Sequence, residues 1–285
     1  MKTLLLQLDS DRHPSAFDRI VGYDAGADEV LGYGGVQAGD VRDLVHGAIF
    51  TRGPKVLKNT AIFVGGSDLG VGEEILERVK EAFFGPLRVS VMLDSNGSNT
   101  TAVAAVAKLE GAAVGLKGKR ALVVAGTGPV GRRAAGLFAR AGADVTITSR
   151  SQGAADRARE AIERRFECSI SARVASYPLG PGSLLQDADI VLAGGPPGAR
   201  LIESAAWSEG GGPSVLGDAN AVPPLGIEGV EPGDDGEQKN RVTVFGALGI
   251  GGFKMKLHKA CIARLFSAND LILDAEAIYD VARSL

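Results

Sequence analysis

The sequence has 285 residues, of which 45% are hydrophobic and 23% are charged, and its formal net charge at pH 7 is -3. A chain of this length can form two domains, each with its own buried core. Its composition is that of a globular protein and excludes the disordered and fibrous classes. The weak negative charge also argues against a basic surface for nucleic acid or anionic membranes.

Cysteine and histidine usage shows neither a disulfide framework nor a metal site. Cys168 and Cys261 lie far apart, and the three histidines show no ligand spacing, which favours two reduced thiols and no metal. The N-terminal apolar run is too short for a signal peptide, and no stretch approaches the roughly 20 residues of a membrane helix. We therefore expect a cytoplasmic protein with no membrane or nucleic-acid partner.

Short apolar runs alternate with helical patterns along almost the whole chain. The runs expected to be strands are Leu4–Leu8, Ala61–Val64, Val89–Leu93, Ala121–Ala125, Val145–Thr148, Ile190–Ala193 and Val242–Phe245. Their apolarity is continuous rather than alternating, which is typical of parallel strands covered by helices on both faces. The alternation predicts an α/β fold with doubly wound sheets.

We predict two doubly wound parallel-sheet domains with a cleft between them. Residues 1–114 are expected to form a substrate domain, and residues 115–257 a Rossmann domain for a dinucleotide. The boundary is placed at a charged, glycine-containing step, Leu116–Arg120, which precedes the most nucleotide-like strand. The helical segment 258–285 has no clear strand pattern and is expected to pack back on the first domain.

The strongest local motif is a GxGxxG sequence that follows the strand Ala121–Ala125 and opens a helix. A second strand follows that helix, which is the context of a dinucleotide-binding turn rather than of an isolated glycine-rich turn. Gly126 permits the tight turn, Gly128 lets the backbone approach the pyrophosphate, and Gly131 allows close helix packing. The candidate cofactor residues here are Gly126, Thr127, Gly128, Pro129, Val130 and Gly131.

The end of the second strand predicts the choice of cofactor. NAD sites usually have Asp or Glu there, whereas this chain has Ser149, Arg150 and Ser151, which suit a 2′-phosphate. We predict NADP, with NAD as a weaker second cofactor; a solvated role for Arg150 is the alternative. Gly194 and Asn220 follow two later strands and are expected to line the nicotinamide side, unless they are simple turns.

The first half of the chain has polar residues at predicted strand ends, where open α/β folds bind their ligands. Asp94 and Asn96 follow a buried strand directly, and the polar string continues into a helix N-terminus. Helix capping explains part of that string equally well. The candidate substrate residues in this half are Thr51, Arg52, Asp94, Asn96, Asn99 and Thr100.

The segment Phe245–Gly252 is rich in glycine and is expected to precede a helix with Lys254 and Lys256 in its first turn. Lysine there opposes the helix macrodipole, so a polar or anionic ligand would explain the placement. The alternative is that these lysines are exposed and bind no ligand, despite the unfavourable interaction with the dipole.

The match to a known family runs essentially from end to end. The stretches that carry this match are Val21–Asp24, Thr51–Gly53, Thr60–Gly66, Met92–Thr101, Ala125–Gly131, Pro223–Gly226 and Phe245–Gly252. In these stretches the chain resembles the NADP-dependent methylene-tetrahydromethanopterin dehydrogenases of methylotrophic bacteria, a family with members that act on methylene-tetrahydrofolate.

The resemblance implies direct hydride transfer from the methylene carbon to C4 of the nicotinamide, within formaldehyde oxidation. No proton leaves with the hydride, so no strong base is required. We expect Lys256 to hold the pterin ring toward the nicotinamide, with Lys254 nearby and Asp94 at the opposite polar edge. The resemblance also implies a homo-oligomer, a trimer or hexamer.

Three alternatives remain open. One is a methylene-tetrahydrofolate dehydrogenase, and another is an NADP-dependent dehydrogenase of a small hydroxy or keto acid. The latter should have a usable His or Lys–Asp pair. The third is a nucleotide-sensing module, which would bind cofactor without turnover.

Overall fold

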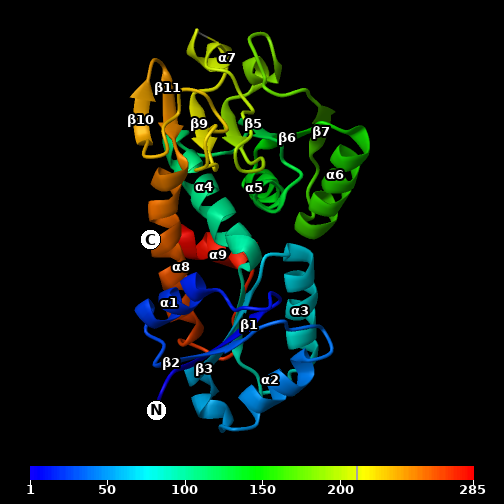
Figure 1. Cartoon of the computed structure of the whole chain (residues 1–285), viewed down its shortest axis with the longest axis vertical. Coiled ribbons are helices and arrows are strands. Elements are labelled where there is room, and N and C mark those ends of the chain that lie inside the picture. Colours follow the sequence, from blue (N-terminus) through cyan, green and yellow to red (C-terminus); the bar gives the residue numbers. More distant parts are fainter. Residues whose placement is uncertain (210) are drawn as a thin grey trace. The chain divides into compact units, whose positions relative to one another are not determined.

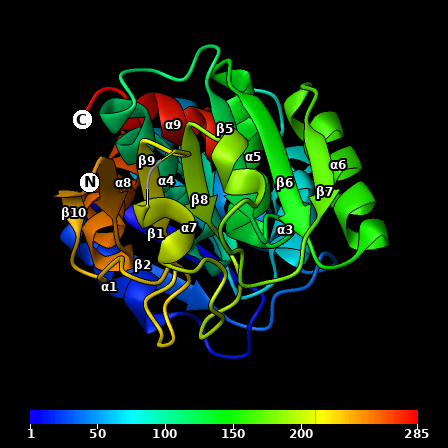
Figure 2. The same ribbon diagram turned by 90° about the horizontal axis from the view of Figure 1, so that it is seen from above.

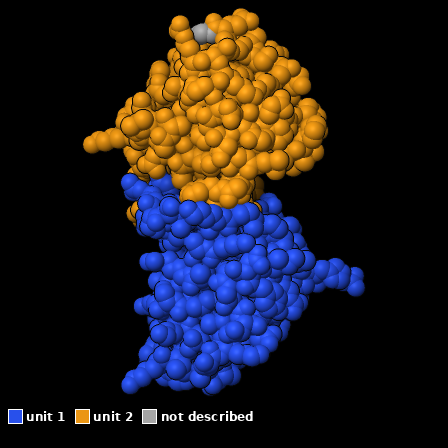
Figure 3. Space-filling view, turned by 90° about the vertical axis from the view of Figure 1, so that its left-hand side faces the viewer, with its two compact units in different colours: residues 1–100, 255–285 blue, residues 101–254 orange. Residues whose placement is uncertain are grey.

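The computed structural model describes residues 1–209 and 211–285, which form two compact units (Figure 3). Unit 1 comprises Met1–Thr100 with Met255–Leu285, and unit 2 comprises Thr101–Lys254. The predicted α/β class with parallel sheets is confirmed. Among the described residues, no helix is both long and apolar enough to cross a membrane.

The unit boundaries differ from the predicted ones at 114/115 and 257/258 because they fall inside helices. Helix α4 (Ser98–Ala112) begins in unit 1, but its later part packs in unit 2. There, a Cβ on Gly217 of strand β9 (Val215–Asp218) would lie 3.0 Å from the side chain of Leu109. Helix α8 (Ala247–Leu265) passes from unit 2 into unit 1. The glycine-containing segment Leu116–Arg120 therefore connects α4 to the next strand within unit 2 and is not a boundary between the units.

Unit 1 is built on a five-stranded parallel sheet with the order β12-β4-β3-β1-β2. Figure 1 labels its strands β1, β2 and β3, which lie together in the blue part of the chain. The strands are β1 (Leu4–Asp9), β2 (Glu29–Tyr33), β3 (Thr60–Gly65), β4 (Ser90–Leu93) and β12 (Ile272–Leu273). The helices that lie wholly in this unit are α1 (Ala16–Asp24), α2 (Val41–Ile49), α3 (Leu69–Glu81) and α9 (Ala275–Ala282).

One core cluster of unit 1 joins the sheet to α2 and α3. Leu8, Val64 and Leu93 from the strands are fully buried together with Val45 and Ile75 from the helices. Because β3 and β4 have buried residues throughout, these strands show the continuous apolarity that the sequence displays.

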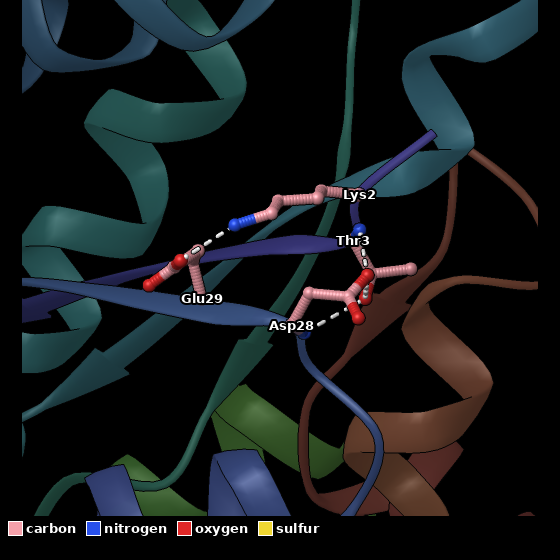
Figure 4. Close-up of polar contacts among 4 residues, drawn as sticks. All are labelled: Lys2, Thr3, Asp28 and Glu29. Atoms are coloured by element: carbon pink, nitrogen blue, oxygen red, sulfur yellow. Dashed lines mark hydrogen bonds and ion pairs between the residues drawn. The ribbon is translucent and has the colours of Figure 1, made fainter.

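The amino ends of β1 and β2 are joined by exposed polar contacts (Figure 4). Lys2 Nζ donates to Glu29 at 2.9 Å, and Asp28 accepts from the N–H of Thr3 at 2.7 Å and from its hydroxyl at 2.9 Å. The bonds from Thr3 lower the pKa of Asp28. Exposed pairs of this kind add little stability, so they align the strands rather than hold the unit together.

Unit 2 has a seven-stranded sheet with the order β10-β11-β9-β8-β5-β6-β7 (Figure 2). The other strands are β5 (Arg120–Val124), β6 (Asp144–Ser149), β7 (Ser171–Val174), β8 (Ile190–Ala193), β10 (Asp235–Lys239) and β11 (Val242–Phe245). Its remaining helices are α5 (Pro129–Arg140), α6 (Gln152–Phe166) and α7 (Ala205–Ser208). All neighbouring strands are parallel except the β10–β11 pair. From β11 to β7 the order is that of a Rossmann fold, with its switch point between β8 and β5.

The prediction that a helix starts after Gly252 is wrong, because α8 begins at Ala247 and includes the glycines. A Cβ on Gly249 would lie 2.1 Å from the carbonyl oxygen of Asp234, so the helix start lies directly against that loop. Pro232 O accepts the N–H of Leu248 at 2.7 Å. Backbone carbonyl oxygens therefore accept N–H groups at the start of α8, which would otherwise lack partners. The helix dipole thus gives no reason to expect a ligand at Lys254 and Lys256.

Two glycine substitutions in α8 test this packing. Gly249→Ala should lower the free energy of unfolding by about 1–3 kcal/mol, because the new methyl group overlaps the Asp234 backbone. Gly251→Ala is the matched control, since its Cβ meets nothing within 4 Å, and it should stabilise by up to about 1 kcal/mol. Urea unfolding measures both changes; equal effects of the two substitutions would contradict the close approach of α8 to Asp234.

Candidate active site

The dinucleotide motif lies at the switch point of unit 2. Helix α5 starts at Pro129 with Gly128 as its N-cap, directly after the turn that follows β5. A Cβ on Gly131 would lie 2.7 Å from the Cα of Gly126, so only glycine allows α5 to approach the turn this closely. Gly128 has no side chain to cap the first-turn N–H groups, which suits them to bind an anion.

Gly128 borders open space, because a Cβ there would meet only the carbonyl oxygen of Gly194, at 3.8 Å. Gly194 follows β8, and its N–H donates to Val124 O of β5 at 3.0 Å. The two strand ends at the switch point are thus joined. A glycine turn beside open space, followed by a helix N-terminus, is the arrangement that accepts a pyrophosphate.

Sequence reasoning missed two hydroxyls beside this turn. The N–H of Ala125 donates to Thr148 Oγ1 and to Tyr177 Oη, both at 3.1 Å, and the two hydroxyl oxygens lie 2.8 Å apart. Burial raises the pKa of the Tyr177 phenol, which therefore stays protonated near neutral pH. Tyr177 comes from the loop after β7, and no local pattern in the sequence marks it.

The end of β6 has Arg150 where NAD sites have a carboxylate. Arg150 is exposed, and its charge slightly offsets the effect of burial on the pKa of Tyr177. Ser149 is buried and accepts the N–H of Ser151 at 3.4 Å. Ser151 caps α6 by accepting the N–H of Ala154 at 3.4 Å. Arg150 and the two serines thus follow one another at the end of β6.

Asn220 has a local structural role rather than a side chain directed to a ligand. Its amide donates to the carbonyl oxygens of Val222 and Pro224 at 3.0 and 3.1 Å and accepts the N–H of Val222 at 2.9 Å. Asp218 accepts the N–H groups of Asn220 and Ile227, and burial raises the pKa of its carboxyl. Its amide therefore shapes the loop after β9, and its place beside the nicotinamide stays a prediction.

At the carboxyl edge of the unit 1 sheet, the polar residues after β4 form hydrogen bonds largely with one another and with nearby backbone. Asp94 is 2% exposed and accepts from the N–H of Thr100 at 2.9 Å and from its hydroxyl at 2.5 Å. Asn99 is buried and donates to a β4 carbonyl at 2.6 Å and to Asp274 at 2.9 Å. Asp94, Asn99 and Thr100 therefore shape the start of α4, in line with the capping alternative.

Two further turns lie at the same edge as Asn96. The N–H of Asn96, an exposed residue with φ of 56°, donates to Gly66 O after β3 at 2.6 Å. Ser67 donates its hydroxyl to Asp11, after β1, at 2.8 Å. Because β4, β3 and β1 are neighbours, their polar ends share one edge. Asp11 was missed, although it follows an apolar strand as closely as Asn96 does.

Thr51 and Arg52 are not brought to that edge. Arg52 Nη1 donates to Asn59 O at 2.9 Å and to Thr60 Oγ1 at 3.1 Å, and Thr60 is the first residue of β3. Thr51 Oγ1 donates to Ala48 O at 3.3 Å. A strand of this length separates its two ends by roughly 15–20 Å. Arg52 and Asp94 therefore lie at opposite ends of neighbouring strands, and the substrate role expected for Thr51 and Arg52 stays a prediction.

Lys254 and Lys256 lie in the middle of α8, not in its first turn. Lys256 is exposed, and its Nζ donates to Leu285 O at 3.1 Å. Lys254 is half-buried. Within residues 1–209 and 211–285, no three His, Cys, Asp or Glu side chains gather in a group suited to a metal ion.

Comparisons with known proteins agree with this division of the chain. Residues 16–96 match the family model described as "Methylene-tetrahydromethanopterin dehydrogenase, N-terminal", and residues 121–178 match "3-hydroxyacyl-CoA dehydrogenase, NAD binding domain". A solved quinate dehydrogenase from Corynebacterium glutamicum in complex with NAD shares the fold, with a TM-score of 0.53 at 14% identity over 100% of this chain and 99% of that one.

Two curated relatives come from Methylorubrum extorquens. The "NAD(P)-dependent methylenetetrahydromethanopterin dehydrogenase" is 29% identical over 99% of this chain and 98% of its own. The "Bifunctional protein MdtA" is 47% identical over 100% of this chain and 99% of its own. With this identity over its whole length and the matching N-terminal model, the chain belongs to the methylene-tetrahydromethanopterin dehydrogenase family.

Proposed function

We propose that this chain transfers a hydride from methylene-tetrahydromethanopterin to NADP and so produces methenyl-tetrahydromethanopterin. The observation that carries the proposal is the glycine turn of residues 126–131 at the switch point, in a chain whose residues 16–96 match the N-terminal model of this family. The activity for which the 29% identical relative is named supports the same reaction.

The residues of unit 2 fit a dinucleotide. The open space beside Gly128 and the first turn of α5 would take the pyrophosphate. Arg150, flanked by Ser149 and Ser151, would hold the 2′-phosphate, with NAD bound more weakly. Bound NADP supplies the hydride acceptor, C4 of its nicotinamide ring.

We place the pterin carrier at the carboxyl edge of unit 1, beside Asn96 and Asp11. Asp11 is exposed and has one oxygen bonded to Ser67, which leaves a carboxylate oxygen for the donor groups of a pterin ring. Asp94, Asn99 and Thr100 would act indirectly, by fixing the turn that presents Asn96.

The reaction breaks one C–H bond, and both electrons leave with the hydrogen, so no proton has to be accepted. The buried carboxylates at this edge are suited to structure rather than to base catalysis. Asp9 accepts the N–H groups of Asp11 and Ser15, both at 2.9 Å, and Asp94 is bonded to Thr100. The work of this chain is then orientation of the two reactants and placement of charge.

We place the reaction in formaldehyde oxidation in the cytoplasm, and we expect a homo-oligomer, a trimer or hexamer. Helix α1 supports subunit contact, because it exposes Phe17, Ile20 and Tyr23 by 48%, 62% and 43%. Apolar side chains gathered in this way often mark an interface.

A substrate panel tests the function. The purified chain is mixed with methylene-tetrahydromethanopterin or methylene-tetrahydrofolate, each with NADP or NAD, and absorbance of the reduced nicotinamide is followed. The proposal predicts the fastest turnover with the methanopterin carrier and NADP. Higher activity with the folate carrier or with a small hydroxy acid would contradict it, as would cofactor binding without any turnover.

The choice of NADP depends on Arg150. Arg150→Asp should lower kcat/KM for NADP by about 10- to 100-fold more than for NAD, because a charge-assisted contact of about 1.5–3 kcal/mol is lost and repulsion is added. Arg164→Asp, an equal change of charge at the far end of α6, is the control and should affect neither cofactor. Equal losses for NADP and NAD would show that Arg150 does not bind the 2′-phosphate.

Although the dipole argument fails, Lys256 still suits the role of orienting the pterin ring, because it is an exposed cation of unit 1 and its ammonium group has donors beyond the bond to Leu285 O. Lys256→Ala should lower kcat by about tenfold or more while the Kd for NADP stays unchanged, since orientation alone can supply several kcal/mol. Lys259→Ala is the matched control on the same helix, because Lys259 Nζ forms an exposed ion pair with Asp24 at 2.8 Å. Turnover of Lys256→Ala at the wild-type rate would remove Lys256 from the site.

A further inference from the structure

The carboxyl ends of three neighbouring strands meet at the single backbone N–H of Ala125. Ala125 directly follows β5, Thr148 lies near the end of β6, and Tyr177 lies in the loop after β7. Both hydroxyls accept this N–H at 3.1 Å and lie 2.8 Å from each other. Three chain segments that are distant in sequence are therefore joined at the first residue of the cofactor turn.

Ala125 needs such support because its backbone is in the left-handed region, with φ of 54°. Residues with a side chain rarely adopt this conformation unless their surroundings fix it. The next N–H, of Gly126, donates to Thr148 O at 3.0 Å. Two successive peptide groups are thus attached to β6 immediately before the residues that face the pyrophosphate.

Tyr177 is well placed to make this attachment rigid. Thr148 is fully buried, and Tyr177 packs with Ala125 against the apolar cluster of unit 2. Since the phenol is bonded to both the N–H of Ala125 and the hydroxyl of Thr148, the Thr148 side chain and the peptide cannot move independently.

We propose that Tyr177, through Thr148, is a positioning residue that holds the turn after β5 in the shape that binds the pyrophosphate of a dinucleotide. The inference rests on the proposed use of a nicotinamide cofactor and extends it to residues outside the glycine motif. Its consequence is specific: the effect of Tyr177 must be common to every ligand with a pyrophosphate, whereas that of Arg150 concerns the 2′-phosphate.

The test is calorimetric titration of Tyr177→Phe with NADP, NAD and ADP-ribose, which shares the pyrophosphate but has neither the nicotinamide nor the 2′-phosphate. The Kd should rise about three- to tenfold, by the same factor for all three ligands, as expected for the loss of one hydrogen bond. At saturating NADP the kcat should stay at the wild-type value. Tyr33→Phe, which changes an exposed tyrosine of unit 1, is the matched control and should leave each Kd unchanged.

Thr148→Val provides a second, nearly isosteric variant. The two hydroxyls accept the same N–H, so their effects on affinity should not be independent. In the double variant Thr148→Val with Tyr177→Phe, the Kd should therefore rise by a smaller factor than the product of the factors for the two single variants. Urea unfolding of each variant should show the folded state intact, which separates a loss of affinity from a loss of fold.

Either of two results would overturn the inference. Unchanged Kd values in Tyr177→Phe would remove Tyr177 from the cofactor site, and a loss confined to NADP would assign it to the 2′-phosphate instead. ADP-ribose reports on the turn without any hydride transfer. A wild-type chain that binds ADP-ribose but oxidises no pterin would therefore refute the proposed function and leave the Tyr177 effect intact.

Discussion

The contact between Gly131 and Gly126 is the constraint on which the cofactor site depends. A Cβ on Gly131 would lie 2.7 Å from the Cα of Gly126, so any side chain would push α5 away from the turn. With glycine, the first turn of α5 lies directly at the switch point, with open space beside Gly128, an arrangement that suits the binding of a pyrophosphate. The hydroxyls of Thr148 and Tyr177 then fix the start of that turn.

Both units use the same physical arrangement, in which parallel strands end together and the polar turns after them share an edge. In unit 2 the turns after β5 and β8 provide the glycines of the proposed pyrophosphate site. In unit 1 those after β1, β3 and β4 bring Asp11, Ser67 and Asn96 to one edge. The buried carboxylates beside them are bonded within the chain, which suits a hydride transfer that needs no base.

Local sequence patterns were enough to predict the fold class and the glycine motif, because continuous apolar strands and a turn between strand and helix are visible over short windows. Contacts between distant residues were not visible. Tyr177 reaches Ala125 only through the pairing of β5, β6 and β7, and Arg52 lies at the opposite end of β3 from the polar turns. Gly249 was expected to precede a helix, yet it lies inside α8, where the helix touches the backbone of Asp234. Most of the site residues remain predictions.

Direct hydride transfer is the central claim, and an isotope measurement tests it most directly. The chain would be supplied with methylene-tetrahydromethanopterin whose methylene bridge carries two deuterium atoms, together with NADP in ordinary water, and the reduced cofactor analysed by mass spectrometry and NMR. Direct transfer predicts deuterium at C4 of the nicotinamide ring and none exchanged with solvent. Reduced cofactor that carries only solvent hydrogen, or the absence of any reduction, would contradict it.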